Sequence, residues 1–97
     1  MAYENQLRIA AQIALLGEVP ATLRSVSITT QEKTLIFRAI LRDGASEDDR
    51  ESLTCVATEI LASLPSDFMV EEDITCFDGS LQGRELPLVV FRRKEAP

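Results

Sequence analysis

Few residues in this chain of 97 could perform chemistry. It contains no histidine, so the commonest general base and metal ligand of enzymes is missing. Cys55 and Cys76 lack the Cys-x-x-Cys spacing of a zinc site. Gly79 and Gly83 fall in a loop that precedes no predicted helix, so they do not form a phosphate-binding loop. We therefore expect no cofactor and no metal centre.

The densest group of reactive side chains is three consecutive carboxylates, Glu71, Glu72 and Asp73. Paired carboxylates can hydrolyse glycosidic bonds, but such sites need substrate platforms that a chain with no Trp and one Tyr lacks. The sequence thus predicts no catalytic residues and no enzyme. Two interpretations of the carboxylates remain: an acidic binding strip, or a charged strand that keeps a sheet edge from pairing with other molecules.

Acidic residues are concentrated in one stretch of the chain. Twelve acidic and two basic side chains lie between Asp43 and Glu85, which gives −10 there, in a chain whose total is −6. Such a region repels nucleic acid and anionic membranes and attracts cationic proteins. We expect a protein partner, and neither nucleic acid nor membrane.

Targeting signals are not evident. The longest apolar run, Ile13 to Leu16, is far shorter than the ~20 residues of a membrane span, and the N-terminal residues do not resemble a signal peptide. We expect a cytoplasmic protein with reduced thiols. The length predicts a single domain over residues 1–97, with a frayed tail at 94–97.

Hydrophobic periodicity and turn residues predict six elements. These are helices over 3–16 and from Ser46 to Pro65, and strands over 23–30, 34–42, 68–77 and 86–93. The fold class is α+β, a two-layer α/β domain of order α-β-β-α-β-β. Both helices should cover one face of a four-stranded antiparallel sheet, with residues 78–85 as the loop of the second hairpin.

Both helices are predicted from apolar residues at helical spacing. In the first, this spacing indicates a well-buried helix: Leu7, Ala10, Ala11 and Ala14, widened by Ile9, Ile13 and Leu16. The second begins at Ser46, a good N-cap, with Asp49 at the third helical position in a variant capping box. Its single core-facing stripe is Leu53, Val56, Ala57, Ile60, Leu61 and Leu64, and Pro65 ends the helix.

One charged residue, Glu72, does not fit the apolar pattern of the predicted strands. The apolar phase of the third strand is Phe68, Val70, Ile74 and Cys76. Glu72 shares this phase and therefore intrudes on the buried face unless it lies at a sheet edge or a bulge. Phe77 and Phe91 have the opposite phase, which favours an apolar patch on the second face, or a place in the core if the phase of the strands is the reverse. Arg38 and Arg42 are expected to pair with carboxylates of the third strand.

Four short segments, in this order, resemble one class of proteins: Thr22–Ile28 (TLRSVSI), Glu47–Glu51 (EDDRE), Ala57–Ile60 (ATEI) and Glu71–Ile74 (EEDI). From about Leu7 to Arg93 the chain resembles small bacterial immunity proteins of contact-dependent growth inhibition and polymorphic toxin systems. The resemblance implies a cytosolic, non-catalytic inhibitor that binds the C-terminal toxin domain of its own locus. Many such toxins are nucleases with basic clefts, which an acidic face would complement.

The expected partner-binding residues follow from charge placement alone. They are Glu71, Glu72, Asp73 and Asp78 near the third strand, with Asp48, Asp49 and Glu59 on the second helix as a further set. The alternative function is a structural or adaptor domain that forms a homodimer through an exposed sheet face or edge. A small enzyme or ligand-binding regulator would instead require a well-formed apolar pocket.

Overall fold

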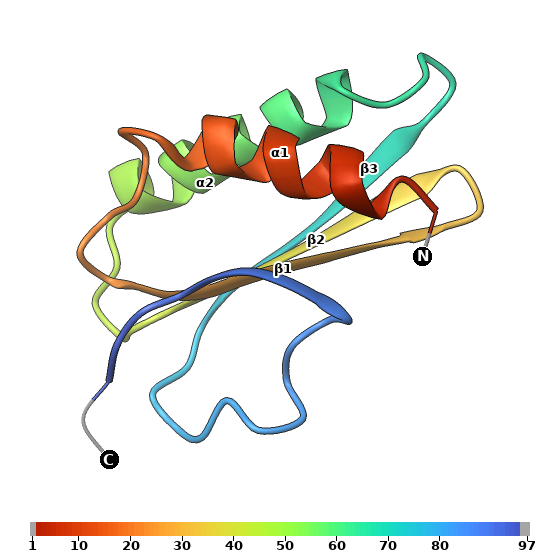
Figure 1. The fold of residues 1–97 in the computed structure, drawn as a ribbon. Coiled ribbons are helices and arrows are strands. Elements are labelled where there is room, and N and C mark those ends of the chain that lie inside the picture. The colour runs from red at the N-terminus through yellow and green to blue at the C-terminus, as the bar shows by residue number, and fades with distance from the viewer. Residues whose placement is uncertain (1, 96–97) are drawn as a thin grey trace.

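The computed structural model describes residues 2–95, and its elements follow the predicted order. They are α1 (Glu4–Leu15), β1 (Leu23–Gln31), β2 (Thr34–Leu41), α2 (Glu47–Ala62), β3 (Met69–Cys76) and β4 (Leu88–Arg92). Figure 1 shows both helices on one face of the four-stranded sheet, running in opposite directions. The two-layer α+β arrangement is therefore confirmed.

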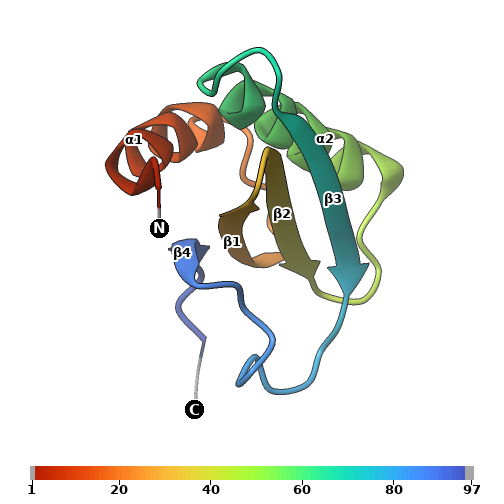
Figure 2. The ribbon, with the colours of Figure 1, turned by 90° about the vertical axis from the view of Figure 1, so that its right-hand side faces the viewer.

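The sheet is mixed, so the prediction of an antiparallel sheet was wrong. The strand order is β3-β2-β1-β4. β1 is antiparallel to both of its neighbours, whereas β2 and β3 are parallel. The cause is α2, which follows β2 and runs back along the sheet, so that β3 begins at the same end as β2 (Figure 2). A helix that joins two adjacent strands in this way forces them to be parallel.

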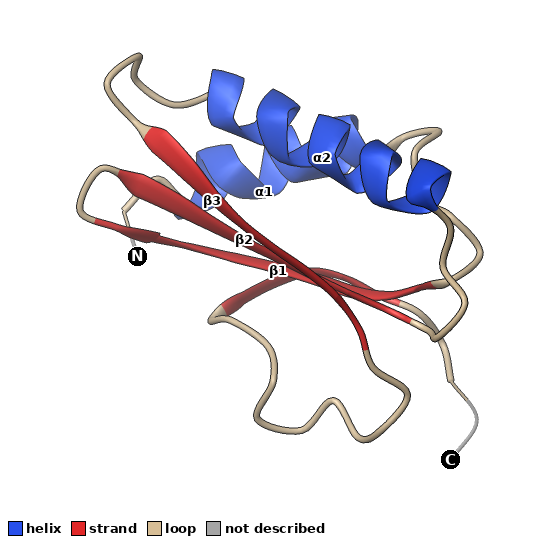
Figure 3. Ribbon diagram, turned by 180° about the vertical axis from the view of Figure 1, so that it is seen from behind, coloured by secondary structure: helices blue, strands red, loops and turns tan. Residues whose placement is uncertain are grey.

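The segment between β3 and β4 is consequently not a hairpin loop. β3 and β4 form opposite edges of the sheet, and the segment crosses the face that the helices leave open (Figure 3). Gly79 allows the close packing at its start, because a Cβ atom there would lie 2.4 Å from the ring of Phe77. This crossing covers part of the sheet face that the sequence had left to solvent or a partner.

The second helix forms as predicted. The Ser46 hydroxyl accepts a hydrogen bond from the Asp49 amide, and the Asp49 carboxylate accepts one from the Ser46 amide, which completes the capping box. The side of α2 that faces the sheet is buried through Leu53, Val56, Ala57 and Ile60, and Leu64, just beyond the helix, is buried as well.

The first helix is buried on one side only. Leu7, Ala11, Ala14 and Leu15 pack against the core. Ile9, Ile13 and Leu16, which were predicted to widen the buried side, are exposed by 60%, 62% and 77%. The prediction failed because α1 lies in the outer layer, where the sheet can cover only one side of a helix.

The central strands alternate between the two faces of the sheet. Val26 and Ile28 of β1 face the helices with Phe37 and Ala39 of β2. Phe91 also packs against this core, so its assignment to the second face was wrong. The pairing of β1 with β4 shifts register between Val26 and Ser27, and such a bulge reverses the phase of the residues beyond it. Phe77 instead lies under the Arg84 guanidinium, 3.6 Å from the ring centre.

Candidate functional site

The three consecutive carboxylates lie on β3, which is an edge strand. Glu72 pairs with Phe37 in the parallel register, and it shares the helix-facing side of the strand with Val70 and Ile74. Its side chain is nevertheless exposed. The sequence had required an edge or a bulge for a carboxylate in this phase, and the edge position is confirmed. Glu71 projects from the other face of the same strand and is also exposed.

Asp73 is held by the sheet itself. The Arg38 Nε donates a hydrogen bond to Asp73 Oδ2 at 2.8 Å, and the two residues are direct partners in the β2–β3 register. Arg38 also donates to the Arg84 carbonyl at 3.0 Å, which ties the crossing segment to the sheet. The predicted pairing of Arg38 with a carboxylate of the third strand is therefore confirmed. Asp73 is less free to bind a partner than its two neighbours.

The free edge of β3 presents the backbone groups of every second residue. The amides of Met69 and Phe77 donate to the carbonyls of Lys33 and Leu41, on the side of β2. Because backbone groups alternate in direction along a strand, the even-numbered residues between them direct their amides and carbonyls outwards.

Arg50 of α2 covers one end of this edge. Its Nη1 donates to the outward Ile74 carbonyl at 2.9 Å, and its Nη2 lies 3.4 Å from the Cys76 sulfur. The edge therefore stays open mainly around Val70 and Glu72. The sequence analysis missed this role, because nothing local to Arg50 indicates which strand will lie beside it.

The acidic residues of α2 are of two kinds: one is hydrogen-bonded within the protein, and the others are exposed without an internal partner among the described residues. Asp49 accepts hydrogen bonds from the Thr22 hydroxyl at 2.8 Å and from the Ser46 amide at 3.2 Å. These bonds, that of Thr22 above all, hold the pKa of the Asp49 carboxyl below its ordinary value. Asp48 and Glu59, by contrast, are exposed and make no hydrogen bond or ion pair within residues 2–95.

The two predicted acidic sets do not form one surface. Glu59 follows Arg50 by nine residues, about two and a half helical turns, so the two side chains leave opposite sides of α2. Arg50 reaches β3, and Glu59 therefore points away from Glu71 and Glu72. Glu47, one turn before Arg50, lies on the side of β3, is exposed and was not among the expected residues. We call Glu47, Glu71 and Glu72 the acidic edge.

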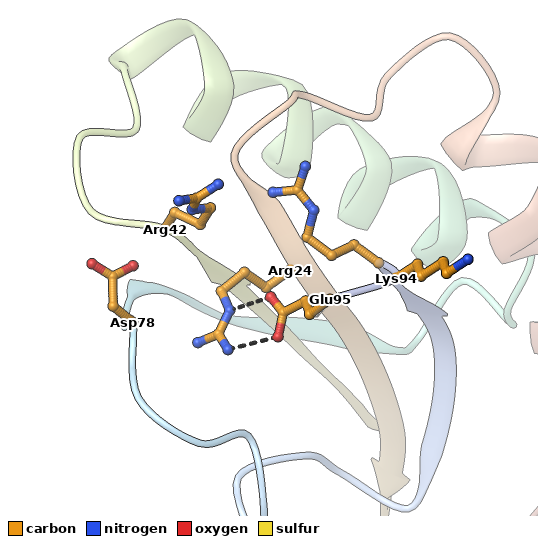
Figure 4. Close-up of a pocket in the computed structure, with 6 residues that line it drawn as sticks. Arg24, Arg42, Asp78, Lys94 and Glu95 are labelled. Atoms are coloured by element: carbon orange, nitrogen blue, oxygen red, sulfur yellow. Dashed lines mark hydrogen bonds and ion pairs between the residues drawn. The ribbon is translucent and has the colours of Figure 1, made fainter. Parts of the chain in front are cut away.

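The remaining expected residue, Asp78, lies in a separate hollow of about 670 Å³. Figure 4 shows it beside Arg42, across the hollow from Glu95. Positively charged side chains dominate this lining: Arg24, Arg42, Arg93 and Lys94. Asp78 also accepts a hydrogen bond from the Asp43 amide at 3.1 Å. These surroundings separate Asp78 from the acidic edge.

Arg24 lines the hollow, and only 7% of this residue is exposed. Its Nε and Nη2 donate to the two carboxylate oxygens of Glu95 at 2.7 and 2.9 Å, and its Nη1 donates to the Phe77 and Gly79 carbonyls. The Glu95 hydrogen bonds raise the pKa of the Arg24 guanidinium and lower that of the Glu95 carboxyl. Of the tail that was predicted to be frayed, residues 96–97 lie outside the described residues, and the fraying itself stays a prediction.

Two other kinds of site were sought in the part of the chain that the structure describes. No cluster of three or more potential metal-ligating His, Cys, Asp or Glu side chains occurs there. No helix among residues 2–95 is long and apolar enough to cross a membrane.

Comparison with known proteins points to a family. No curated protein matches the chain. A family model described as MafI2 immunity protein matches residues 4–95, which is nearly the whole chain. Every described element lies within the matched range. The chain therefore belongs to the MafI2 immunity protein family, and it is a small toxin-neutralising immunity protein of a bacterial polymorphic toxin system.

Proposed function

We propose that this protein neutralises its cognate toxin in the cytoplasm by docking the acidic edge onto a cationic surface of the toxin domain. A nuclease would present such a surface, because a cleft that binds phosphates is lined with Lys and Arg. The immunity protein then acts by occupying the cleft and performs no chemistry of its own.

The observation that supports this proposal is the lack of internal partners at the acidic edge. Within residues 2–95, Glu47, Glu71 and Glu72 are exposed and make no side-chain hydrogen bond or ion pair with the rest of the protein. Asp49, Asp73 and Asp78 each already accept a hydrogen bond from the protein. Carboxylates without internal partners keep their full capacity for an external cation.

The position of these carboxylates also suits recognition. The β2–β3 register fixes the backbone of Glu71 and Glu72, so little backbone freedom is lost when a partner binds. Their charge accelerates encounter with a cationic surface and disfavours partners of the same sign. A binding surface on a sheet edge is more rigid than one on a loop.

A pair of matched charge reversals tests the proposal. One variant carries Glu71→Lys and Glu72→Lys, and the control carries Asp48→Lys and Glu59→Lys on the far side of α2. Both change the net charge from −6 to −2, because each reversal adds two positive charges. We expect the first variant to lower the affinity for the purified toxin domain on the order of 100-fold, and the control less than about tenfold.

Calorimetric titration at two salt concentrations provides the measurement, and circular dichroism confirms that both variants are folded. An equal loss of affinity in the two variants would show that only the overall field of the protein matters. Unchanged affinity in the first variant would reject the proposal. The charges of β3 would then serve only to keep the sheet edge from pairing with other molecules.

Chemical footprinting tests the same surface without mutation. Carbodiimide coupling labels exposed carboxylates, and mass spectrometry reports how much each residue is labelled. In the toxin complex we expect Glu71 and Glu72 to become protected while Glu59 stays reactive. Protection of Glu59 with no change at Glu71 would place the toxin on the helical layer instead.

A further inference from the structure

The outer side of α1 carries an apolar stripe that the rest of the described protein does not cover. It consists of Ile9 and Ile13 of the helix and of Leu16, the C-cap residue that directly follows it, and we call these three residues the outer stripe. The spacing of four residues places Ile9 and Ile13 on one side of the helix, and Leu16 continues the apolar surface at its end. Five of the six exposed large hydrophobic residues lie between Tyr3 and Val19, so this exposure is concentrated around α1.

The outer stripe makes α1 apolar on two opposite sides. Leu7 and Ala14 on the inner side are buried against the sheet, while Ile9 and Ile13 on the outer side are more than half exposed. A helix that is apolar on both sides normally has neighbours on both sides. A contiguous exposed apolar patch is typical of a protein–protein contact.

The charges on α1 indicate what kind of partner fits. The only charged residues of the helix, Glu4 and Arg8, are paired with each other at 3.5 Å. The residues between the members of the stripe, such as Gln12, are uncharged. This side of α1 is therefore neutral in a chain of net charge −6. It offers nothing to attract a cationic toxin, but it is where two acidic copies could approach with the least repulsion.

We propose that the outer stripe is a contact between two copies of this protein. In a two-fold symmetric pair the same patch meets itself. Antiparallel packing of the two α1 helices about an axis near Ile13 would place Ile9 of one copy against Leu16 of the other. The surface differs from the acidic edge, so a dimer leaves Glu71 and Glu72 of both copies free for the toxin.

The acidic residues of α2 give the dimer a distinct salt dependence. Asp48 and Glu59 lie on the same layer as the stripe, on the side of α2 away from β3. In the dimer the α2 helices of the two copies flank the apolar contact with like charge. Added salt screens this repulsion, so self-association should become stronger with salt. Binding of a cationic toxin should become weaker under the same change.

Sedimentation equilibrium of the purified protein over a wide concentration range tests the proposal. We expect a reversible monomer–dimer equilibrium in the unmodified protein and a monomer at all concentrations in the Ile13→Glu variant. The matched control is Thr54→Glu, which adds the same charge at an exposed position of α2 and should still dimerise. Both positions tolerate glutamate, since they are exposed and glutamate favours helix.

A charge pair tests the antiparallel arrangement. Ile9→Lys alone and Leu16→Glu alone should each weaken the dimer, and the double variant should restore it by pairing the two charges between copies.

Two results would overturn the proposal. One is an unmodified protein that stays monomeric throughout, and the other is a dimer that survives Ile13→Glu. If the protein is monomeric and Ile13→Glu weakens toxin binding, the outer stripe belongs to the toxin contact. Neither result bears on the acidic edge, which is tested by its own variants.

Discussion

Asp49 is a carboxylate that already has partners within the protein. The sequence placed it both in a capping box and among the binding residues. In the structure its Oδ2 accepts hydrogen bonds from both Thr22 and Ser46, so a single oxygen serves the start of α2 and the connection to β1. Asp48, the preceding residue, has no such bonds among the described residues and remains free. Adjacent acidic residues therefore differ in role because only one of them faces the protein.

The lowered pKa of Asp49 predicts a pH dependence of stability. Because the folded-state pKa lies below the ordinary value of 3.8, the carboxylate stabilises the fold fully above that value and loses this effect as the pH falls through the folded-state pKa. Asp49→Asn should therefore be less stable than the unmodified protein at neutral pH, and the difference should shrink below about pH 4. Urea unfolding at a series of pH values measures it.

A constant difference between the two proteins from neutral to acidic pH would contradict this prediction. Asp48→Asn is the matched control, because it removes a neighbouring charge that makes no bond, and its effect on the pH profile should be much smaller. Glu95, whose pKa is also lowered, contributes a similar slope to both proteins and therefore cancels in the comparison.

Among the elements, β3 is the one whose neighbours determine which part of it is accessible to a partner. It is an edge strand, and Arg50 of α2 binds one of its outward carbonyls. The edge is thus blocked near Ile74 and open near Glu72. A strand guarded by charge at one end and by a guanidinium at the other resists pairing with further strands, while its carboxylates stay accessible.

We predict that Arg50→Ala removes this guard. The variant should lose about 1 kcal/mol of the free energy of unfolding, since one hydrogen bond to a backbone carbonyl is lost. It should also aggregate faster on mild heating, because the edge near Ile74 becomes available to other chains. Urea unfolding and light scattering measure the two effects.

Arg50→Lys is the informative control for this prediction. It keeps the charge but loses the planar fork that reaches both Ile74 and Cys76, so its stability should lie between the other two. If Arg50→Ala aggregates faster but is as stable as the unmodified protein, Arg50 protects the edge by its charge alone.

Local signals in the sequence predicted the helices and strands well, but they predicted poorly which elements lie side by side. Ser46, Asp49 and the buried stripe of α2 define that helix from within, so its prediction was correct. The parallel pairing of β3 depends on the path of α2 over the sheet, and the position of Phe91 depends on a bulge between strands. Neither is encoded near the residues concerned. The acidic character of β3 was visible, whereas the role of Arg50 required the assembled layers.

At the scale of the whole molecule, charge is divided between two regions. The acidic edge lies along β3 and α2, while Arg24, Arg42, Arg93 and Lys94 gather around the hollow shown in Figure 4. A cationic partner is therefore attracted to the acidic edge more than to the hollow. Such a division orients an encounter before contact is made.

This division predicts fast and salt-sensitive association with the toxin domain. The association rate constant should fall on the order of tenfold between low and physiological ionic strength, while the dissociation rate changes little. Stopped-flow mixing at several salt concentrations measures both. A rate constant that does not depend on salt would argue that charge plays no part in the encounter.

The ion pair between Arg24 and Glu95 joins two segments that are far apart in the sequence, and this affects when the fold is completed. Arg24 and Glu95 are 71 positions apart, and β4 completes the sheet beside β1 only after every other element. Contacts between such distant residues form late, because a long loop must close first. We therefore expect a newly made chain to pass through an interval in which β1 is paired with β2 but its other edge is still open. If protection needs the complete sheet, it would depend on the stock of finished molecules present when a toxin arrives, rather than on how quickly new ones can be made.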